Sequence, residues 1–377
     1  MKFGTKILHT KDNIDKTTGA LSIPIYQVST YHQNDIENMG EYTYSRCENP
    51  TRRALENTVA ELEGGKYGFA FSSGMAAASA ILSIFSMGDH IILADDLYGG
   101  TYRLATSIFN RFGLEFTFVD AGDIKNIENA IKPNTKAMFL ETPSNPLLKI
   151  TDLKGAVKIA KENNIITIVD NTFMSPYLQR PLDLGIDIVW HSGTKFLAGH
   201  SDVVAGFAIT NSEELSKRIY YIQNGFGSIL GPQDSWLTLR GIKTLKARLD
   251  IQQQNAKKVA EFLEVHEKVE KVYYPGLKSH EGYDIHNSQS FGPGAVLSFE
   301  TKDYTSAKYF MDNIKYAAVA VSLGGVETIV SYPAKMSHSA MAKEEREKRG
   351  IKDSLIRVSL GLEDIDDLLK DINNALI

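Results

Sequence analysis

The segment DIVWHSGTKFLAGHSD, residues 187 to 202, places one lysine directly after a short apolar strand. Lys195 lies among small, hydroxyl and apolar residues, not among the charged residues that usually surround a surface lysine. Partial burial of this kind lowers the pKa of an amine and leaves a neutral, nucleophilic fraction. Schiff-base chemistry requires a neutral lysine amine.

The neighbours of Lys195 offer groups that bind phosphate. Ser192 and Thr194 carry hydroxyls, and Gly193 and Gly199 let backbone N–H groups approach an anion. A phosphate beside a reactive lysine favours pyridoxal 5'-phosphate (PLP) as the cofactor. The alternative is a lysine that extends from a strand end to solvent beside an ordinary turn, because a motif this short also occurs by chance.

Length and composition indicate a globular protein with two domains. The chain has 377 residues, of which 43% are hydrophobic and 23% charged. Its net charge of -5 offers no attraction to nucleic acid or to an acidic membrane, so neither is an expected partner. The N-terminal MKFGTKILHTKDN lacks the apolar core of a secretory signal, and the longest apolar-rich stretch, 75–85, is too short to span a bilayer. We therefore expect a cytoplasmic protein.

Metal and nicotinamide sites are not expected. The single cysteine, Cys47, excludes an intramolecular disulfide and a cysteine-cluster metal site, and no H-E-x-x-H or similar zinc spacing occurs. Glycines at 225–231 resemble a dinucleotide-binding loop, but their spacing differs from G-x-G-x-x-G, and the preceding residues 215–224 have the pattern of a helix.

From residue 68 onward, apolar strands alternate with helical segments, which predicts a mostly parallel sheet and the fold class α/β. A long helical pattern over 245–266 leads to a smaller α/β unit. The expected strands are 69–71, 90–94, 115–119, 137–141, 165–170, 187–190, 203–209, 295–299 and 355–359. The expected helices include 74–85, 152–163 (capped by Thr151 or Asp152), 304–314 and 364–376.

We predict three parts of the chain: an N-terminal arm over 1–60, a large cofactor-binding domain over 61–250 and a small C-terminal domain over 251–377. The first 60 residues lack the rhythm of a compact domain and are interrupted by glycines and prolines. We expect this arm to contact a neighbouring subunit, and the alternative is an arm that wraps around its own domain.

Several chemically useful residues follow strands, where ligands of open α/β sheets bind. Ser73, Gly74 and Met75 end a strand and open a helix, which directs N–H groups and the helix dipole at an anion. A plain glycine turn is the alternative. Asp170 closes the strand IITIVD, and a buried carboxylate there needs a partner such as a protonated pyridine nitrogen. An N-cap or an ion pair would also satisfy it.

Three more residues are candidates for the same site. Tyr98 in DDLYGGT can stack on a planar cofactor or pack in the core. Asn145 in ETPSNP lies in a proline-bounded turn, where asparagine also serves as a plain turn former. Arg357 lies inside the apolar run LIRVSLG, and a buried arginine requires an anion such as an amino-acid carboxylate.

Ordered blocks along nearly the whole chain resemble the Cys/Met-metabolism family of PLP-dependent enzymes, which includes cystathionine lyases and synthases. The blocks are YSRCENPTR (44–52), SSGMAA (72–77), DDLYGGT (95–101), ETPSNP (141–146), DNTF (170–173), HSGTK (191–195), GHSD (199–202), SLGGVET (322–328) and RVSLG (357–361). The resemblance implies the type I fold of PLP-dependent transferases, like that of aspartate aminotransferase. It also implies a homotetramer built from tight dimers with shared active sites.

Matching positions carry the family's cofactor site onto this chain. The resemblance implies that Lys195 forms the covalent link to PLP, that Asp170 binds the ring nitrogen and that Tyr98 stacks on the ring. The residues that would bind the phosphate within one subunit are Gly74, Met75, Ser192 and Thr194. Tyr44 and Arg46 would reach the phosphate of the neighbouring subunit, which would explain the irregular arm.

The resemblance also implies a substrate site and a reaction. Asn145, Ser322 and Arg357 would position the substrate, Arg357 through its α-carboxylate. The stretches 173–189 and 322–341 most resemble the bacterial cystathionine β-lyases. The implied reaction is β-elimination of L-cystathionine to homocysteine, pyruvate and ammonia in methionine biosynthesis, with Lys195 as the base and Tyr98 assisting proton transfer.

Other reactions of the family remain alternatives, because the choice between Cβ and Cγ depends on a substrate placement that no motif reports. Cystathionine γ-lyase or γ-synthase activity comes first among them, and cysteine desulfhydration is a possible side activity. A sensor or scaffold without turnover finds no support, because the lysine, aspartate and arginine are all present.

Two positions depart from the family pattern. Cys47 and Glu48 stand where many members have Ser-Gly, which brings an extra carboxylate toward the shared phosphate site. Val321 stands where γ-lyases that resemble the animal enzymes have a glutamate, which weakens a γ-lyase interpretation.

Overall fold

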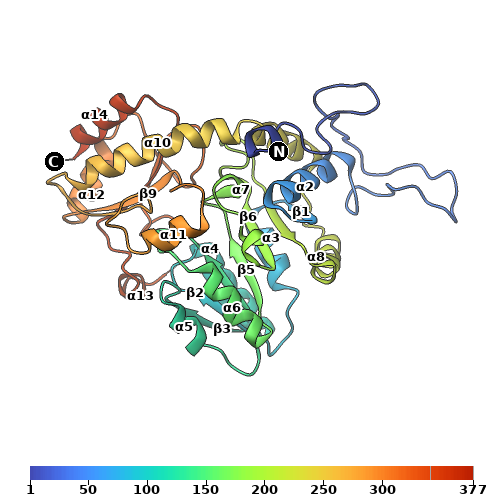
Figure 1. Cartoon of the computed structure of the whole chain (residues 1–377), viewed down its shortest axis with the longest axis horizontal. Helices are drawn as coiled ribbons and strands as arrows, with labels where there is room; N and C mark the ends of the chain where they lie inside the picture. Colours follow the sequence, from blue (N-terminus) through green and yellow to red (C-terminus); the bar gives the residue numbers. More distant parts are fainter. Residues whose placement is uncertain (340, 377) are drawn as a thin grey trace.

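The computed structural model describes residues 1–339 and 341–376, and within these residues two mixed sheets are covered by helices (Figure 1). The strand order of the larger sheet is β1-β7-β6-β5-β4-β2-β3. In it β7 runs antiparallel to both of its neighbours, and the remaining pairs are parallel. Its strands are β1 (Tyr67–Phe71), β2 (His90–Ala94), β3 (Glu115–Val119), β4 (Thr135–Glu141), β5 (Ile166–Asp170), β6 (Ile188–Ser192) and β7 (Gly206–Thr210).

Each strand expected for this sheet overlaps one of β1 to β7, so the α/β prediction is confirmed. The largest difference is at β7, which begins at Gly206, three residues later than expected. The N–H of Ala205 donates to the Thr194 hydroxyl at 3.0 Å, so the chain before Gly206 binds the loop after β6 and does not join the ladder.

Several helices that cover the large sheet, including α3 and α6, begin at side-chain caps that the sequence supplies. Ser73 Oγ accepts the N–H of Ala76 at 3.0 Å, and Asp152 accepts the N–H groups of Lys154 and Gly155 at 3.0 and 3.1 Å, so Asp152 and not Thr151 is the cap. The helices are α2 (Pro50–Glu63), α3 (Gly74–Leu82), α4 (Gly99–Arg103), α5 (Ile124–Asn129), α6 (Leu153–Asn163), α7 (Ser175–Leu178), α8 (Glu213–Phe226) and α9 (Pro232–Ile242), with short η1 (Leu104–Ile108), η2 (Phe109–Phe112) and η3 (Pro181–Leu184).

The smaller sheet of the described chain has the order β10-β11-β12-β9-β8 and carries its own helices. It contains β8 (Val269–Tyr273), β9 (Val296–Thr301), β10 (Ala318–Val319), β11 (Ile329–Ser331) and β12 (Leu355–Ser359). Its helices are α11 (Tyr283–Gln289), α12 (Tyr304–Asn313), α13 (Lys343–Lys348) and α14 (Ile365–Ala375). The predicted elements 295–299, 304–314, 355–359 and 364–376 match β9, α12, β12 and α14.

The long helix α10 (Leu245–Glu264) contributes to the cores of both sheets (Figure 1). Leu245 and Leu249 pack in the core beneath the large sheet, whereas Val259 and Leu263 pack with Phe299 in the core of the small sheet. The predicted domain boundary near residue 250 falls inside this helix. None of the helices formed by the described residues has the length and apolar character needed to cross a membrane.

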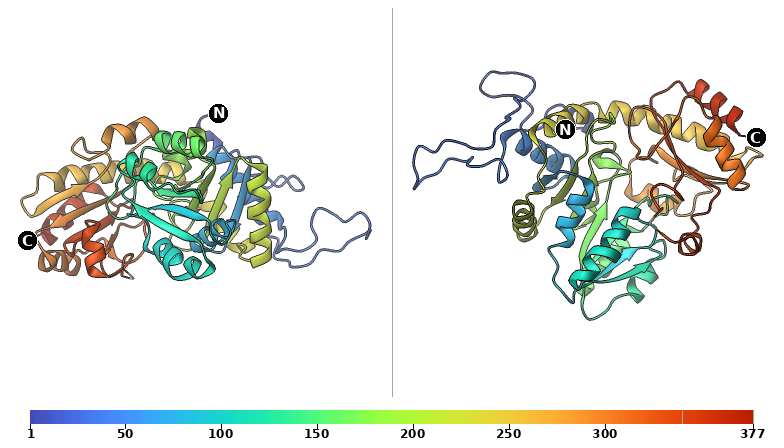
Figure 2. Two further views of the ribbon diagram at one scale, coloured as in Figure 1. Left: turned by 90° about the horizontal axis from the view of Figure 1, so that it is seen from below. Right: turned by 180° about the vertical axis from the view of Figure 1, so that it is seen from behind.

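The N-terminal segment is extended only as far as Asn49. After α1 (Phe3–Lys6), the chain forms loops that project away from the two domains (Figures 1 and 2). Residues 50–60 were expected in the arm but form most of α2, whose Leu55 and Val59 are fully buried. Asn49 as cap, Pro50 at the first helical position and apolar residues at helical spacing were the overlooked signals.

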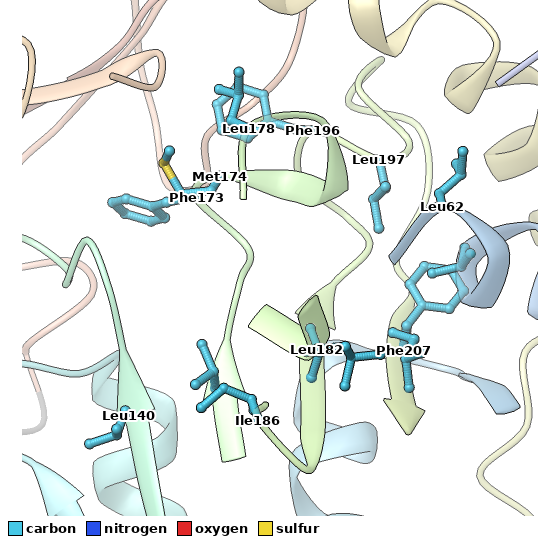
Figure 3. Packing of buried hydrophobic residues seen from close by; sticks show 14 of the residues in the cluster. Leu62, Leu140, Phe173, Met174, Leu178, Leu182, Ile186, Phe196, Leu197 and Phe207 are labelled. Atoms are coloured by element: carbon cyan, nitrogen blue, oxygen red, sulfur yellow. The ribbon is translucent and has the colours of Figure 1, made fainter. Parts of the chain in front are cut away.

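Buried side chains support the loops that follow β5 and β6 (Figure 3). Phe173 and Met174 follow β5, and Phe196 and Leu197 follow Lys195; all four belong to one buried cluster. Because these side chains are buried, both loops are held against the core, which fixes the residues at the ends of β5 and β6.

Close approach of β7 to the start of α3 gives a testable constraint. A Cβ at Gly206 would lie 2.1 Å from the carbonyl oxygen of Ser73, so Gly206→Ala should overpack this junction and destabilise the protein by roughly 1–3 kcal/mol. Gly225→Ala is the matched control, because a Cβ there meets nothing within 4 Å and alanine suits its helix. Denaturant unfolding measures both, and equal stability of the two variants would contradict the expectation.

Candidate active site

A cleft of about 480 Å³ opens at the carboxyl ends of the large sheet, between the two sheets. Strand ends of the large sheet supply most of its wall, and Ser322, Ser331 and Arg357 come from the C-terminal part of the chain. The structure brings together ten residues expected at the site: Gly74, Met75, Tyr98, Asn145, Asp170, Ser192, Thr194, Lys195, Ser322 and Arg357.

The amine of Lys195 is held by Ser322. Lys195 Nζ donates a hydrogen bond to Ser322 Oγ at 2.7 Å, although 127 residues separate the two in sequence. Ser322 has φ of 97°, a backbone conformation that costs energy for a residue with a side chain and that recurs at functional sites. Burial lowers the pKa of Lys195 to about 8, with a further contribution from the charge of Arg357 and opposition from Asp170.

Arg357 is buried on β12 and binds three residues of the cleft. Its Nη1 donates to Asn145 Oδ1 at 2.8 Å, and its Nη2 donates to the Ser322 carbonyl at 2.8 Å and to Ser331 Oγ at 3.1 Å. Among the described residues Nε has no hydrogen-bond partner. Burial lowers the pKa of Arg357 to about 10. A buried guanidinium with only neutral partners is suited to receive a carboxylate.

Asp170 and Glu141 end adjacent parallel strands in register, and both line the cleft. Burial raises the pKa of Asp170 to about 6, against the hydrogen bonds of Thr172 and the charges of His191 and Lys195. Burial and the charge of Asp170 raise the pKa of Glu141 well above its usual range. Glu141 also accepts the backbone N–H of Tyr98 at 2.9 Å, so it fixes the loop that carries this ring.

Sequence reasoning missed Glu141, although the signal was the one that identified Asp170: a carboxylate that closes an apolar strand. The block ETPSNP (141–146) contains both Glu141 and Asn145, and only Asn145 was predicted to belong to the site. A second buried carboxylate was also missed. Glu63 accepts hydrogen bonds from His191 Nε2 at 2.5 Å and from Asn171 Nδ2 at 2.8 Å. It therefore fixes the residue that follows Asp170 at the end of β5 and the residue that precedes Ser192 at the end of β6.

The start of α3 forms an anion cradle with the loop after β6. The Ser73 cap binds the N–H of Ala76, which leaves the first N–H groups of the helix, at Gly74 and Met75, directed into the cleft. A Cβ at Gly74 would lie 2.9 Å from Ser192 Cβ, so the approach of α3 to β6 requires glycine. The hydroxyls of Ser192 and Thr194 line the same cleft.

These residues fit PLP. The cradle suits its phosphate, the amine with a lowered pKa suits its aldehyde, and the strand-end carboxylate of Asp170 suits its ring nitrogen. Tyr98 lies over the same loop: a Cβ at Gly100 would lie 2.4 Å from the Tyr98 ring and 2.9 Å from Met75 Sδ. The ring therefore packs close to Gly100 at the cleft wall.

Tyr44 and Arg46 do not line this cleft. Tyr44 is 44% exposed, and the Arg46 guanidinium lies 5.7 Å from the Tyr44 ring centroid beside a separate hollow formed with α8. Their expected contact with a neighbouring subunit stays a prediction. Glu48, the unusual carboxylate of this segment, binds Arg53 Nε at 3.0 Å.

Known proteins resemble the chain over its whole length. The family model described as Cys/Met metabolism PLP-dependent enzyme matches residues 4–377. A cystathionine beta-lyase MetC from Bacillus subtilis is 55% identical over 99% of this chain and 95% of its own, and a cystathionine gamma-lyase from the same organism is 51% identical over 100% and 99%. A solved cystathionine gamma-lyase from Lactobacillus plantarum, complexed with L-serine, superposes with a TM-score of 0.97 at 46% identity, covering 100% of this chain and 98% of that one.

The lowered pKa of Lys195 predicts how cofactor capture depends on pH. The rate at which the cofactor-free protein bonds PLP covalently should rise with pH through about 8, because only the neutral amine reacts. Arg357→Met removes a cation that lowers this pKa, so the midpoint should move to higher pH, whereas Arg357→Lys keeps the charge and should stay close to the wild type. Rapid-mixing absorbance spectroscopy measures the midpoints, and an unchanged midpoint in Arg357→Met would contradict this electrostatic account.

Proposed function

The chain belongs to the Cys/Met-metabolism family of PLP-dependent enzymes, and we propose that it is a lyase that converts L-cystathionine to homocysteine, pyruvate and ammonia. The observation that carries the proposal is the placement of Lys195: a buried amine with a pKa of about 8, in one cleft with Asp170 and Arg357. The 55% identity to a bacterial cystathionine beta-lyase supports the choice of β-elimination.

Cofactor binding in this proposal uses the strand ends of one subunit. Bound PLP supplies an electron sink for the negative charge that develops at the substrate's Cα. Asp170 binds the ring nitrogen, and Tyr98 stacks on the ring from the loop that Glu141 fixes. The phosphate is bound by the N–H groups of Gly74 and Met75 and by the hydroxyls of Ser192 and Thr194.

Substrate binding and proton transfer use the residues that meet at Ser322. Arg357 binds the α-carboxylate of the substrate, with its guanidinium oriented by Asn145 and Ser331. Lys195 Nζ takes the Cα proton, because a pKa of about 8 leaves part of the amine neutral near neutral pH. Ser322 Oγ binds this amine in the structure and would hold it once the substrate's amino group has displaced it from the cofactor.

We propose a cytoplasmic homotetramer of tight dimers in which Tyr44 and Arg46 complete the phosphate site of the adjacent subunit. Loops between α1 and α2 project away from the body of their own subunit, which supports this arrangement (Figure 2). The position of the product homocysteine one methyl transfer before methionine places the reaction in methionine biosynthesis.

Cystathionine γ-lyase is the second candidate, because a bacterial gamma-lyase is 51% identical over nearly its full length. Val321 lies at the cleft and is 68% exposed, so this position is free to contact the distal part of a substrate. An apolar side chain there offers no carboxylate to the amino group of a long substrate, which weakens the γ-lyase assignment.

The products of L-cystathionine separate the two candidates. We expect purified protein loaded with PLP to release pyruvate and homocysteine, as identified by mass spectrometry. Release of 2-oxobutyrate and cysteine as the main products would instead assign γ-elimination.

Lys195→Ala tests the proposed base. Turnover should fall by at least about 10²-fold, since a positioned general base contributes 10²- to 10⁴-fold. Lys158→Ala, which removes an exposed lysine of α6, serves as the control and should keep full turnover. Turnover of Lys195→Ala within tenfold of the wild type would assign the base to another residue.

A further inference from the structure

One buried arginine binds three consecutive carbonyl groups at the root of the N-terminal arm. Arg52, in the first turn of α2, is 1% exposed. Its Nη1 donates to the Ser45 carbonyl at 2.7 Å, and its Nη2 donates to the carbonyls of Arg46 and Cys47 at 3.3 and 2.8 Å. The N–H groups of Cys47 and Glu48 close a turn on the Tyr44 carbonyl, and the arginine, by binding the carbonyls of this turn, fixes the backbone of 45–47 in one shape.

The segment shaped in this way carries exposed side chains outward. Tyr44 and Arg46 are both exposed, and in the described part of the chain the Arg46 guanidinium has neither a hydrogen bond nor an ion pair. Asn49 reinforces the same turn, because its Nδ2 donates to Ser45 Oγ at 3.2 Å and to the Tyr26 carbonyl at 2.9 Å. The backbone is therefore ordered from within the subunit, while the side chains of Tyr44 and Arg46 remain exposed.

The charge of Arg52 is only loosely balanced within the subunit. Its Nε lies 3.5 Å from Glu56 Oε1 and has no hydrogen-bond partner among the described residues. Burial raises the pKa of Glu56 to about 7, so this carboxyl is partly neutral near pH 7. Carbonyl oxygens are thus the main partners of this fully buried guanidinium, so its desolvation is offset chiefly by hydrogen bonds that hold the 45–47 backbone.

We propose that Arg52 is a positioning residue for the active site of the neighbouring subunit, which it serves by fixing the 45–47 backbone that presents Tyr44 and Arg46. The inference rests on the shared phosphate site of the proposed function. The competing account is local: Glu56 also accepts the N–H of Ala70 in β1 at 2.8 Å, and β1 leads to the anion cradle of the same subunit. Arg52 would then act on its own site.

Arg52→Lys separates the two accounts. Lysine keeps the positive charge but lacks the planar fork that reaches several carbonyls. We expect the affinity of the cofactor-free variant for PLP to fall by at least about tenfold in a fluorescence titration, with unchanged helix content by circular dichroism. The decisive measurement is whether PLP binding is restored when the neighbouring subunit supplies an intact arm, or only when the cleft of the same chain is intact.

Co-expression with Lys195→Ala gives that measurement. In a hybrid dimer, the intact arm of the Lys195→Ala chain completes the cleft of the Arg52→Lys chain. Equal co-expression with random assortment should then restore about a quarter of the wild-type sites. Borohydride reduction at limiting PLP, followed by intact-mass analysis, counts cofactor fixed on Lys195 of the Arg52→Lys chain without measuring turnover.

Two further co-expression experiments with Lys195→Ala serve as controls. Arg46→Ala with Lys195→Ala tests the shared site itself, and failure of this pair to recover labelling would overturn both the shared site and the present inference. Arg248 is another buried arginine, 3% exposed, that binds the Phe196 and Gly241 carbonyls beside the lysine loop, so Arg248→Lys should damage its own cleft and stay unrescued. Recovery for Arg46→Ala but not for Arg52→Lys would overturn the role of Arg52 alone.

A second variant covers the case in which Arg52→Lys does not fold. Asn49→Ser keeps a helix-capping oxygen but removes the amide that binds Ser45 and Tyr26. It should show the same pattern, weaker PLP binding that a Lys195→Ala partner rescues, to a smaller degree. Weaker binding without rescue would contradict the proposal.

Discussion

Two cations, Lys195 and Arg357, share one buried cleft, and a single serine binds both of them. The hydroxyl of Ser322 accepts from the lysine and its carbonyl accepts from the arginine. Burial is the main reason why the pKa of Lys195 is lowered, and the positive charge of Arg357 adds to it, so the lysine is kept partly neutral. The nucleophile is therefore produced by its surroundings, and the rest of the structure keeps those surroundings in place.

The strand ends of the large sheet hold one side of the cleft in place, and buried polar groups hold those strands. Asp170 and Glu141 end paired strands, so the spacing between their carboxyls is set by the ladder and not by flexible loops. The buried contacts of Glu63 with His191 and Asn171 hold the next layer. A cofactor that arrives in such a cleft meets groups whose entropy has already been lost in folding, which favours tight and oriented binding.

The sequence predicts the parts of this arrangement that leave a local trace. An apolar strand followed by Asp170, a lysine among small residues and an arginine within an apolar run each violate an ordinary pattern, and each lies in the cleft. Ser322 was assigned only through family resemblance, because its contact with Lys195 spans 127 residues and depends on a positive φ. Glu141 was missed although it closes an apolar strand in the same way as Asp170. The start of helix α2 was missed because the predicted arm, which has an irregular composition only as far as Asn49, was continued to residue 60.

The helix α10 is shared by two cores that lie on either side of the cleft: Leu249 packs with the large sheet and Leu263 with the small one. Lys195 belongs to the first of these bodies and Arg357 to the second. Residues of α10 also bind both loops, since Arg248 donates to the Phe196 carbonyl next to Lys195 and Gln252 donates to the Gly325 carbonyl beyond Ser322. The distance between the base and the carboxylate-binding group therefore depends on one continuous helix as well as on the shared serine, so a substitution in α10 can alter the cleft without changing any residue that lines it.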